Sequence, residues 1–233
     1  MPQTIHRTLT PERMDRDDVP VDQLRRSLAF IRGVNRCLGG TRAVLCHLKR
    51  FSRVWSADQR IHILDIATGS ADIPLAIVRW GRRAGHDMHV TALDRHESTL
   101  ALAAEHVRGE DRIRLVRADA LSPPFEPRSF DYVVSSMFLH HLDNDQVVQM
   151  LRTMDRLAAR GVVWNDLTRA GRAYWWCRLL TLPSSAIVKH DGPVSVLAGF
   201  RRREVLAVAN RLGLHHLRFR RHFAHRFTLA GQR

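Results

Sequence analysis

The apolar positions of residues 21–57 recur at helical spacing and predict two helices. Gly39-Gly40 separates two sets of apolar residues, namely Leu24, Leu28, Ile31 and Val34, and then Val44, Leu45, Leu48 and Phe51. Residues 1–20 are polar and contain Pro2, Pro11 and Pro20, so we expect a loose arm there. We therefore predict that residues 1–57 form an N-terminal arm and a helical cap.

From residue 61 onward, short apolar runs alternate with segments of helical spacing. We expect strands at residues 61–67, 88–94, 112–119, 130–137 and 161–167. We expect helices at residues 73–83, 98–107, 146–157, 173–182 and 202–212. Two further strands, 214–220 and 224–231, follow each other without a helix between them and suggest a hairpin. Such alternation is typical of a parallel sheet with helices on both faces.

The predicted fold class is therefore α/β. We expect a seven-stranded, mostly parallel Rossmann-like sheet with an antiparallel last strand, formed by residues 58–233. A chain of 233 residues is long enough for one sizeable core plus a small cap.

The chain is strongly basic, with 37 Lys and Arg against 23 Asp and Glu and a net charge of +14. Such a charge suits a polyanionic partner, either nucleic acid or anionic lipid. The arginines are spread along the whole chain, however, and we therefore favour the base composition of the gene as the explanation. Residues 201–233 are the exception, because nine arginines and a single acid, Glu204, can form a basic surface there.

The sequence gives no indication of secretion or of a membrane span. Residues 1–18 have no apolar segment typical of a signal peptide, and no apolar run reaches the roughly 18 to 20 residues that cross a bilayer. Cys37, Cys46 and Cys177 form neither a disulfide framework nor a paired metal motif. We expect a cytoplasmic protein, with peripheral membrane contact left open.

The stretch ILDIATGSAD (63–72) places a small-residue turn directly after the first strand, where open α/β sheets bind ligands. A phosphate-binding loop is excluded, because its lysine is absent. A dinucleotide site needs three glycines, but only Gly69 is present and Asp65 would repel a pyrophosphate. The carboxylate suits a ligand with a cationic amino acid end and no phosphate, as in S-adenosylmethionine.

The next two strands end in the same way. Asp94 stands where a carboxylate accepts hydrogen bonds from both ribose hydroxyls, and Asp119 with Ala120 stands where an adenine amine can be bound. Any one of these acids can be a turn or cap residue. Three acids at three successive strand ends are harder to explain in that way.

With these motifs, residues 60–233 resemble a class I S-adenosylmethionine-dependent methyltransferase, and ILDIATGSAD resembles the first motif of the ubiquinone/menaquinone branch. Ala71 departs from the usual third glycine of that motif. The stretches NRCLGG, LHHLDNDQ, WNDLTR and HDGPVSV also resemble methyltransferases found beside type III polyketide synthases, which implies O-methylation of phenolic or quinol products in secondary metabolism. The expected cofactor-binding residues are Asp65, Ala67, Thr68, Gly69, Asp72, Asp94, Arg95, Asp119, Ala120 and Ser136.

Methyl transfer to oxygen requires an acceptor in place and a base for its proton. His140 and His141 follow the fourth strand; we expect one to be structural and favour His140 as the base. His190 with Asp191 is a second base–orienter pair. Met137 and Phe138 are expected to line the pocket.

Asn165-Asp166 after the fifth strand either contacts the acceptor or caps the next helix. With Asp143 they could also bind Mg²⁺, but we expect no metal. Residues 174–196 form a long connection, typical of a lid, in which Tyr174, Trp175 and Trp176 either line the acceptor site or anchor a helix.

SPPF (122–125) matches a motif of methyltransferases that act on nucleic-acid amines, but it precedes the fourth strand instead of following it. We interpret it as a proline turn. The favoured function is transfer to a small, largely apolar phenolic or quinol-type acceptor. The alternatives are an RNA-directed methyltransferase, C-methylation of a quinone precursor, and a binder without activity. The oligomeric state is not predicted.

Overall fold

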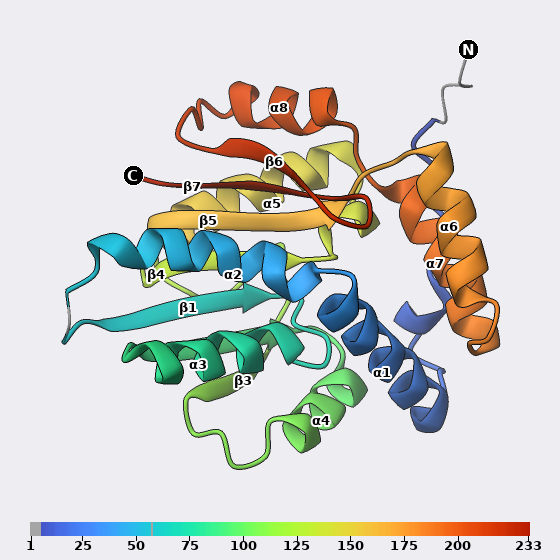
Figure 1. Cartoon of the computed structure of the whole chain (residues 1–233), viewed down its shortest axis with the longest axis horizontal. Helices are drawn as coiled ribbons and strands as arrows, with labels where there is room; N and C mark the ends of the chain where they lie inside the picture. Colours follow the sequence, from blue (N-terminus) through green and yellow to red (C-terminus); the bar gives the residue numbers. More distant parts are fainter. Residues whose placement is uncertain (1–5, 57) are drawn as a thin grey trace.

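The computed structural model describes residues 6–56 and 58–233 and contains one seven-stranded sheet in the order β3-β2-β1-β4-β5-β7-β6 (Figure 1). The strands are β1 (Arg60–Ile66), β2 (Asp87–Asp94), β3 (Ile113–Arg117), β4 (Phe130–Ser136), β5 (Ala158–Leu167), β6 (Arg218–His222) and β7 (Arg226–Gln232). β1 to β5 are mutually parallel, and β7 runs antiparallel to both β5 and β6. The predicted fold class and antiparallel last strand are confirmed.

Eight helices longer than one turn occur among the described residues. They are α1 (Val21–Cys37), α2 (Gly40–Phe51), α3 (Asp72–Ala84), α4 (Glu97–His106), α5 (Asn144–Leu157), α6 (Gly171–Thr181), α7 (Ala186–Ala198) and α8 (Arg202–Arg211). The part of the chain that the structure describes also contains three single-turn 3₁₀ helices: η1 (Arg13–Asp15), η2 (Ser52–Val54) and η3 (Leu139–His141). One core lies under α5 and α8, and a second lies under α2 and α3.

Three helices, α1, α6 and α7, lie beyond the carboxyl ends of the parallel strands, whereas α4 packs on β2 and β3. Figure 1 shows α1, α6 and α7 together on that side of the molecule. β1 pairs with β2 on one edge and with β4 on the other, so the chain reverses its direction of travel across the sheet at β1. Ligands of open α/β sheets bind outside such a reversal point, and α1, α6 and α7 cover it.

Three expectations about local structure need correction. The arm is not loose over residues 6–20, because η1 packs against α7 and the side chains of Arg7 and Asp15 contact η3; Pro2 lies outside the described residues. The long connection 174–196 contains α7, which continues through Gly192-Pro193 although proline removes a helical hydrogen bond. β6 begins at Arg218, because residues 214–217 form a turn in which the Leu217 N–H bonds the carbonyl of Leu214.

Close approach explains why α7 tolerates a glycine. A Cβ built on Gly192 would lie 2.9 Å from the Sγ of Cys177 and 3.0 Å from a methyl carbon of Thr181, both on α6. A larger residue at this position would force the side chains of Cys177 and Thr181 to move. The α6–α7 hairpin, residues 171–198, is therefore a closely packed unit.

The boundary of the predicted cap falls at residue 57, outside the described residues. α2 packs on the sheet through Val44, Leu48 and Phe51, whereas α1 lies over the carboxyl ends of the strands. The division into 1–57 and 58–233 remains a prediction.

Candidate active site

A cavity of about 1780 Å³ opens at the carboxyl ends of β1, β2 and β4. Its floor is formed by the strand ends and the turns that follow them. Its roof is formed by the N-terminal arm, α1, and the α6–α7 hairpin. All ten residues expected to bind a cofactor line this cavity: Asp65, Ala67, Thr68, Gly69, Asp72, Asp94, Arg95, Asp119, Ala120 and Ser136.

The turn between β1 and α3 is tied to the end of β2. The Thr68 hydroxyl donates to Oδ2 of Asp65 at 2.6 Å, and the Gly69 N–H donates to Oδ2 of Asp94 at 2.9 Å. Gly69 has a φ of +56°, in the left-handed region that glycine adopts readily. Ala67 and Ala71 adopt φ of +56° and +55°, so this motif keeps the left-handed turn although alanines occupy both positions.

This wall of the cavity is acidic in a chain that is otherwise strongly basic. Asp65 and Asp94 are both buried. Burial raises the pKa of Asp65 to about 7 against the hydrogen bond from Thr68, and the nearby carboxylates of Asp72 and Asp94 add to the rise. Burial likewise raises the pKa of Asp94. A cationic ligand would relieve this arrangement, whereas a phosphate would be repelled. These carboxylates therefore fit S-adenosylmethionine, whose sulfonium and ammonium groups are both positive.

A second polar network joins α1 to the same wall. Nδ2 of Asn35 donates to Oδ2 of Asp72 at 3.0 Å, and Nη2 of Arg226 donates to Oδ1 of Asn35 at 3.3 Å. Gly40 is packed so closely that a Cβ would lie 2.5 Å from Oδ1 of Asn35. Asn35 and Arg226 line the cavity, whereas Arg36, Gly39 and Gly40 do not. Arg226 had no distinguishing signal in the sequence, because it is one of nine arginines near the C-terminus.

The two adjacent histidines have different surroundings. His140 is buried: Nδ1 lies 2.6 Å from Oδ1 of Asp166, and Nε2 lies 3.5 Å from Oε1 of Glu12. Burial alone would lower the pKa of His140, but Asp166 and Glu12 outweigh it and raise the pKa to about 10. His141 is half-buried, stacks on the His140 ring, and places Nδ1 2.9 Å from a carboxylate oxygen of Asp15. Both histidines line the cavity.

Glu12 was not anticipated, since no pattern distinguishes it within the polar arm. Its side chain is buried beside His140 and accepts a hydrogen bond from the Ser195 hydroxyl of α7. The arm is fixed by Asp191, whose two carboxylate oxygens accept the N–H groups of Arg13 at 2.9 Å and Met14 at 3.0 Å. Asp191 lines the cavity but is occupied by these bonds.

Several expected acceptor-site residues lie behind the cavity wall or outside it. Met137 and Phe138 line the cavity, whereas Asn165, Asp166, Tyr174, Trp175 and His190 do not. Asn165 is buried and donates to the hydroxyl of Ser136 at 2.8 Å. Asp166 is fully buried and accepts from His140, the Trp164 indole and the Leu167 N–H. Neither caps α6, which follows Ala170. Nδ1 of His190 lies 2.8 Å from Asp191, and Trp175 is exposed to solvent.

The magnesium alternative receives no support from the geometry, because its acids are committed elsewhere. Asp143 caps α5 by accepting the Gln146 N–H at 2.8 Å, and Asp166 holds His140. SPPF lies in the β3–β4 connection, before β4, as the turn interpretation requires.

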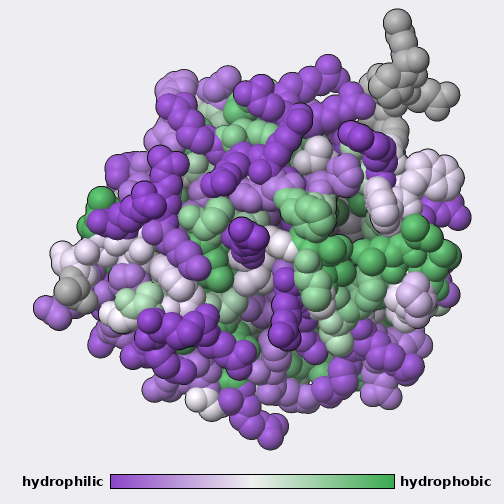
Figure 2. Space-filling model, in the orientation of Figure 1, coloured by the Kyte–Doolittle hydropathy of each residue, from purple (hydrophilic) through white to green (hydrophobic). Residues whose placement is uncertain are grey.

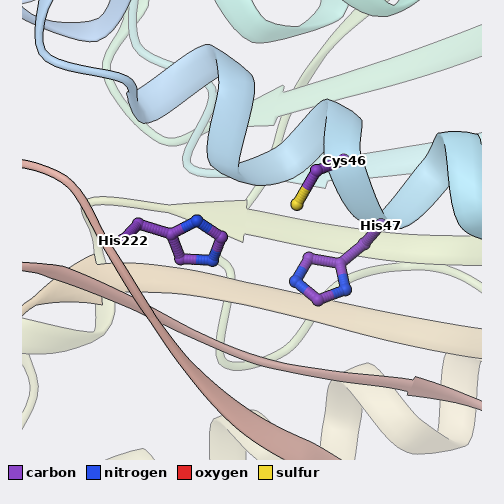
Figure 3. Close-up of side chains that lie close together, drawn as sticks. All are labelled: Cys46, His47 and His222. Atoms are coloured by element: carbon purple, nitrogen blue, oxygen red, sulfur yellow. The ribbon is translucent and has the colours of Figure 1, made fainter.

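A separate cluster lies between α2 and β6. Figure 3 shows Cys46 and His47 on α2 near His222, with donor atoms within 4.8 Å of one another. The Thr228 hydroxyl lies between the two imidazoles, 2.7 Å from Nε2 of His47 and 2.8 Å from Nε2 of His222. Burial, followed by His222 and nearby arginines, lowers the pKa of His47 to about 4. The same positive charges would repel a metal ion, so we interpret this cluster as a hydrogen-bonded core element.

Comparisons with known proteins agree with this geometry. Residues 63–161 match a family model described as a methyltransferase domain. The chain is 34% identical over 98 residues to a demethylmenaquinone methyltransferase of Staphylococcus haemolyticus, covering 42% of this chain and 39% of that protein. It is 29% identical over 115 residues to a demethylmenaquinone methyltransferase of Listeria welshimeri, covering 48% of this chain and 47% of that protein. The chain thus spans less than half the length of these curated relatives.

Solved structures show the fold at low sequence identity. The CurJ carbon methyltransferase aligns with a TM-score of 0.67 at 13% identity, covering 94% of this chain and 62% of that one. A putative S-adenosyl-L-methionine-dependent methyltransferase from Methanococcus maripaludis aligns with a TM-score of 0.63 at 13% identity, covering 95% and 96%. Taken with the family match over residues 63–161 and the acidic strand ends, the chain resembles a class I S-adenosylmethionine-dependent methyltransferase of the menaquinone branch, and the solved structures show that it has the Rossmann-like fold of such enzymes.

Proposed function

We propose that the chain methylates a small, largely apolar phenolic or quinol-type acceptor at oxygen. The observation that carries this proposal is the position of His140, backed by Asp166, on the wall of the same cavity that contains the acidic cofactor wall. The rest of that cavity is mostly apolar and suits an aromatic acceptor with apolar bulk. Its apolar lining includes Leu9, Met14, Phe30, Ile31, Val34, Met137, Phe138, Trp176, Leu180, Ile187 and Val196.

S-adenosylmethionine, when bound, supplies an already activated methyl group, so the protein has to place the acceptor and remove its proton. Asp166 holds Nδ1 of His140, which leaves Nε2 as the atom that can take the acceptor's proton. Glu12 contacts Nε2 and stabilises the protonated ring. Before His140 can act as the base, the Glu12 carboxylate has to take the Nε2 proton and move away, which leaves a neutral ring. The acceptor hydroxyl then occupies the vacated position and gives its proton to Nε2.

C-methylation of a quinone precursor is the second candidate, and the names of the relatives favour it. Both are demethylmenaquinone methyltransferases, so a related ring system is a reasonable acceptor class here. His140 would remove the ring hydroxyl proton in this case too, which makes an adjacent ring carbon electron-rich. Nuclear magnetic resonance of the methylated product separates the two, because an O-methyl and a C-methyl carbon have distinct shifts.

The similarity of four short stretches to enzymes found beside type III polyketide synthases supports a role in secondary metabolism. A cytoplasmic location belongs to the same proposal. Among the described residues, no helix is long and apolar enough to cross a bilayer.

The test is a comparison of His140→Ala with His62→Ala, an exposed histidine of β1 that does not line the cavity. His140→Ala should lower turnover by about 100-fold, the usual contribution of a general base, with the cofactor dissociation constant largely kept. His62→Ala should match the wild type. A wild-type rate for His140→Ala would remove this residue as the base and leave His141 as the remaining candidate that lines the cavity.

A further inference from the structure

The α6–α7 hairpin presents large apolar side chains to solvent. Five of them belong to α6 and the residue that follows it, with exposed fractions from 43% to 66%: Trp175, Trp176, Leu179, Leu180 and Leu182. Figure 2 shows a continuous apolar area on the side of the molecule where Figure 1 places this hairpin. Isolated exposed apolar residues are ordinary, but a contiguous group of this size marks an interaction surface.

All charged side chains that the same hairpin exposes to solvent are cationic. Arg172, Arg178 and Lys189 are exposed, and the single acid of residues 171–198, Asp191, is buried against the arm. The guanidinium of Arg178 lies 5.5 Å from the ring centre of Trp175, so cationic and aromatic groups share one surface. A helix with Trp and Leu on its exposed side and cationic residues around them is typical of binding in the interfacial region of a membrane.

The surface is continuous with the cavity. Trp176 and Leu180 are exposed and also line the cavity, while Cys177 and Thr181 continue the lining inward. An apolar molecule dissolved in a bilayer could pass from the surface to the cavity along α6 without crossing bulk water. This continuity indicates that the exposed apolar side chains of α6 can admit an apolar ligand to the cavity, which their exposure alone would not indicate.

We propose that the α6–α7 hairpin docks the protein on a membrane surface that contains anionic lipid. Charge complementarity selects this occupant over a second copy of the chain. Two chains of net charge +14 repel each other, and the hairpin itself, residues 171–198, exposes no acid to pair with the arginines of a partner. Anionic headgroups attract that same rim, and the tryptophans and leucines enter the headgroup region. This docking does not depend on the identity of the methyl acceptor.

The experiment is sedimentation of the full chain with vesicles, without cofactor or acceptor, so that its result is independent of the proposed function. Vesicles of phosphatidylcholine with 30% phosphatidylglycerol are compared with pure phosphatidylcholine, at low and high salt. We expect at least tenfold tighter binding to the anionic vesicles, weakened by salt, with a blue shift of tryptophan emission as the rings leave water.

The double variant Leu179→Ser with Leu182→Ser should lose at least tenfold in vesicle affinity. Neither residue lines the cavity, and both are exposed, at 58% and 61%, so the fold does not need them. Val54→Ser, at a still more exposed position (70%) on η2, should bind like the wild type. Equal loss in both variants, no binding to anionic vesicles, or self-association through the patch in analytical ultracentrifugation without vesicle binding would each overturn the proposal.

Discussion

Replacing Asp94 by alanine tests the assignment of the cofactor wall. Asp94 ends β2, is buried, and lines the cavity. Its Oδ2 accepts the Gly69 N–H at 2.9 Å and its Oδ1 accepts the His96 N–H at 3.1 Å. Each carboxylate oxygen has a further lone pair, which can accept a ribose hydroxyl of the cofactor. Alanine removes both acceptors and also frees the turn that Gly69 belongs to.

The expected loss follows from the hydrogen bonds left unmade. Two ribose hydroxyls without acceptors cost at least ~2 kcal/mol of binding free energy, or about 30-fold in the dissociation constant. Release of the Gly69 turn adds to this loss, because the turn is no longer held for the ligand. Asp94→Asn keeps one acceptor oxygen and should give an intermediate loss.

Isothermal titration calorimetry with S-adenosylmethionine measures this loss directly. Asp87→Ala is the matched control, because Asp87 begins the same strand and lies at its opposite end, where it pairs with Arg60 on the surface. We expect the control to bind like the wild type. An unchanged dissociation constant for a folded Asp94→Ala variant would refute the cofactor assignment.

Two further predictions concern pH. Glu12→Gln removes one of the two carboxylates that raise the pKa of His140 to about 10. Because the base must be deprotonated, the rise of turnover with pH should shift to lower pH in this variant. Glu126→Gln, on an exposed loop, should keep the wild-type profile, and an unshifted Glu12→Gln profile would exclude contact between Glu12 and the base. The pKa of Asp65 rises on folding from 3.8 to about 7, so the folded state favours the protonated form. The free energy of unfolding is therefore highest below pH 3.8 and falls by ~4 kcal/mol as the pH rises to about 7. Denaturant unfolding of the ligand-free protein across that range should show this decline, and Asp65→Asn should reduce it; identical slopes would contradict the burial of a titrating carboxyl at this position.

The architecture was predictable because its signal is repeated along the chain. Each parallel strand is a short apolar run, and an acid stands at or near the carboxyl end of three of them, so both the sheet and its acidic edge could be inferred from the sequence. Asp119 follows β3 by two residues instead of ending it, yet it still lines the cavity.

The roof of the cavity was less predictable, for physical reasons that differ by segment. α7 carries Gly192-Pro193, which ordinarily ends a helix, but close packing against Cys177 and Thr181 favours the glycine. Glu12 belongs to a polar arm without periodicity and gains its role only through contacts with residues more than a hundred positions away. Local sequence patterns do not contain such long-range contacts.

Methyl-labelled S-adenosylmethionine tests the central claim most directly. The protein is incubated with two pools, alkylated phenols and quinols in one and unmodified total RNA in the other, and the label is followed into each. Label in the organic pool, lost in His140→Ala and kept in His62→Ala, is the result that the proposed site predicts. Label in RNA alone would contradict it, and would mean that the arginine-rich surface selects the acceptor.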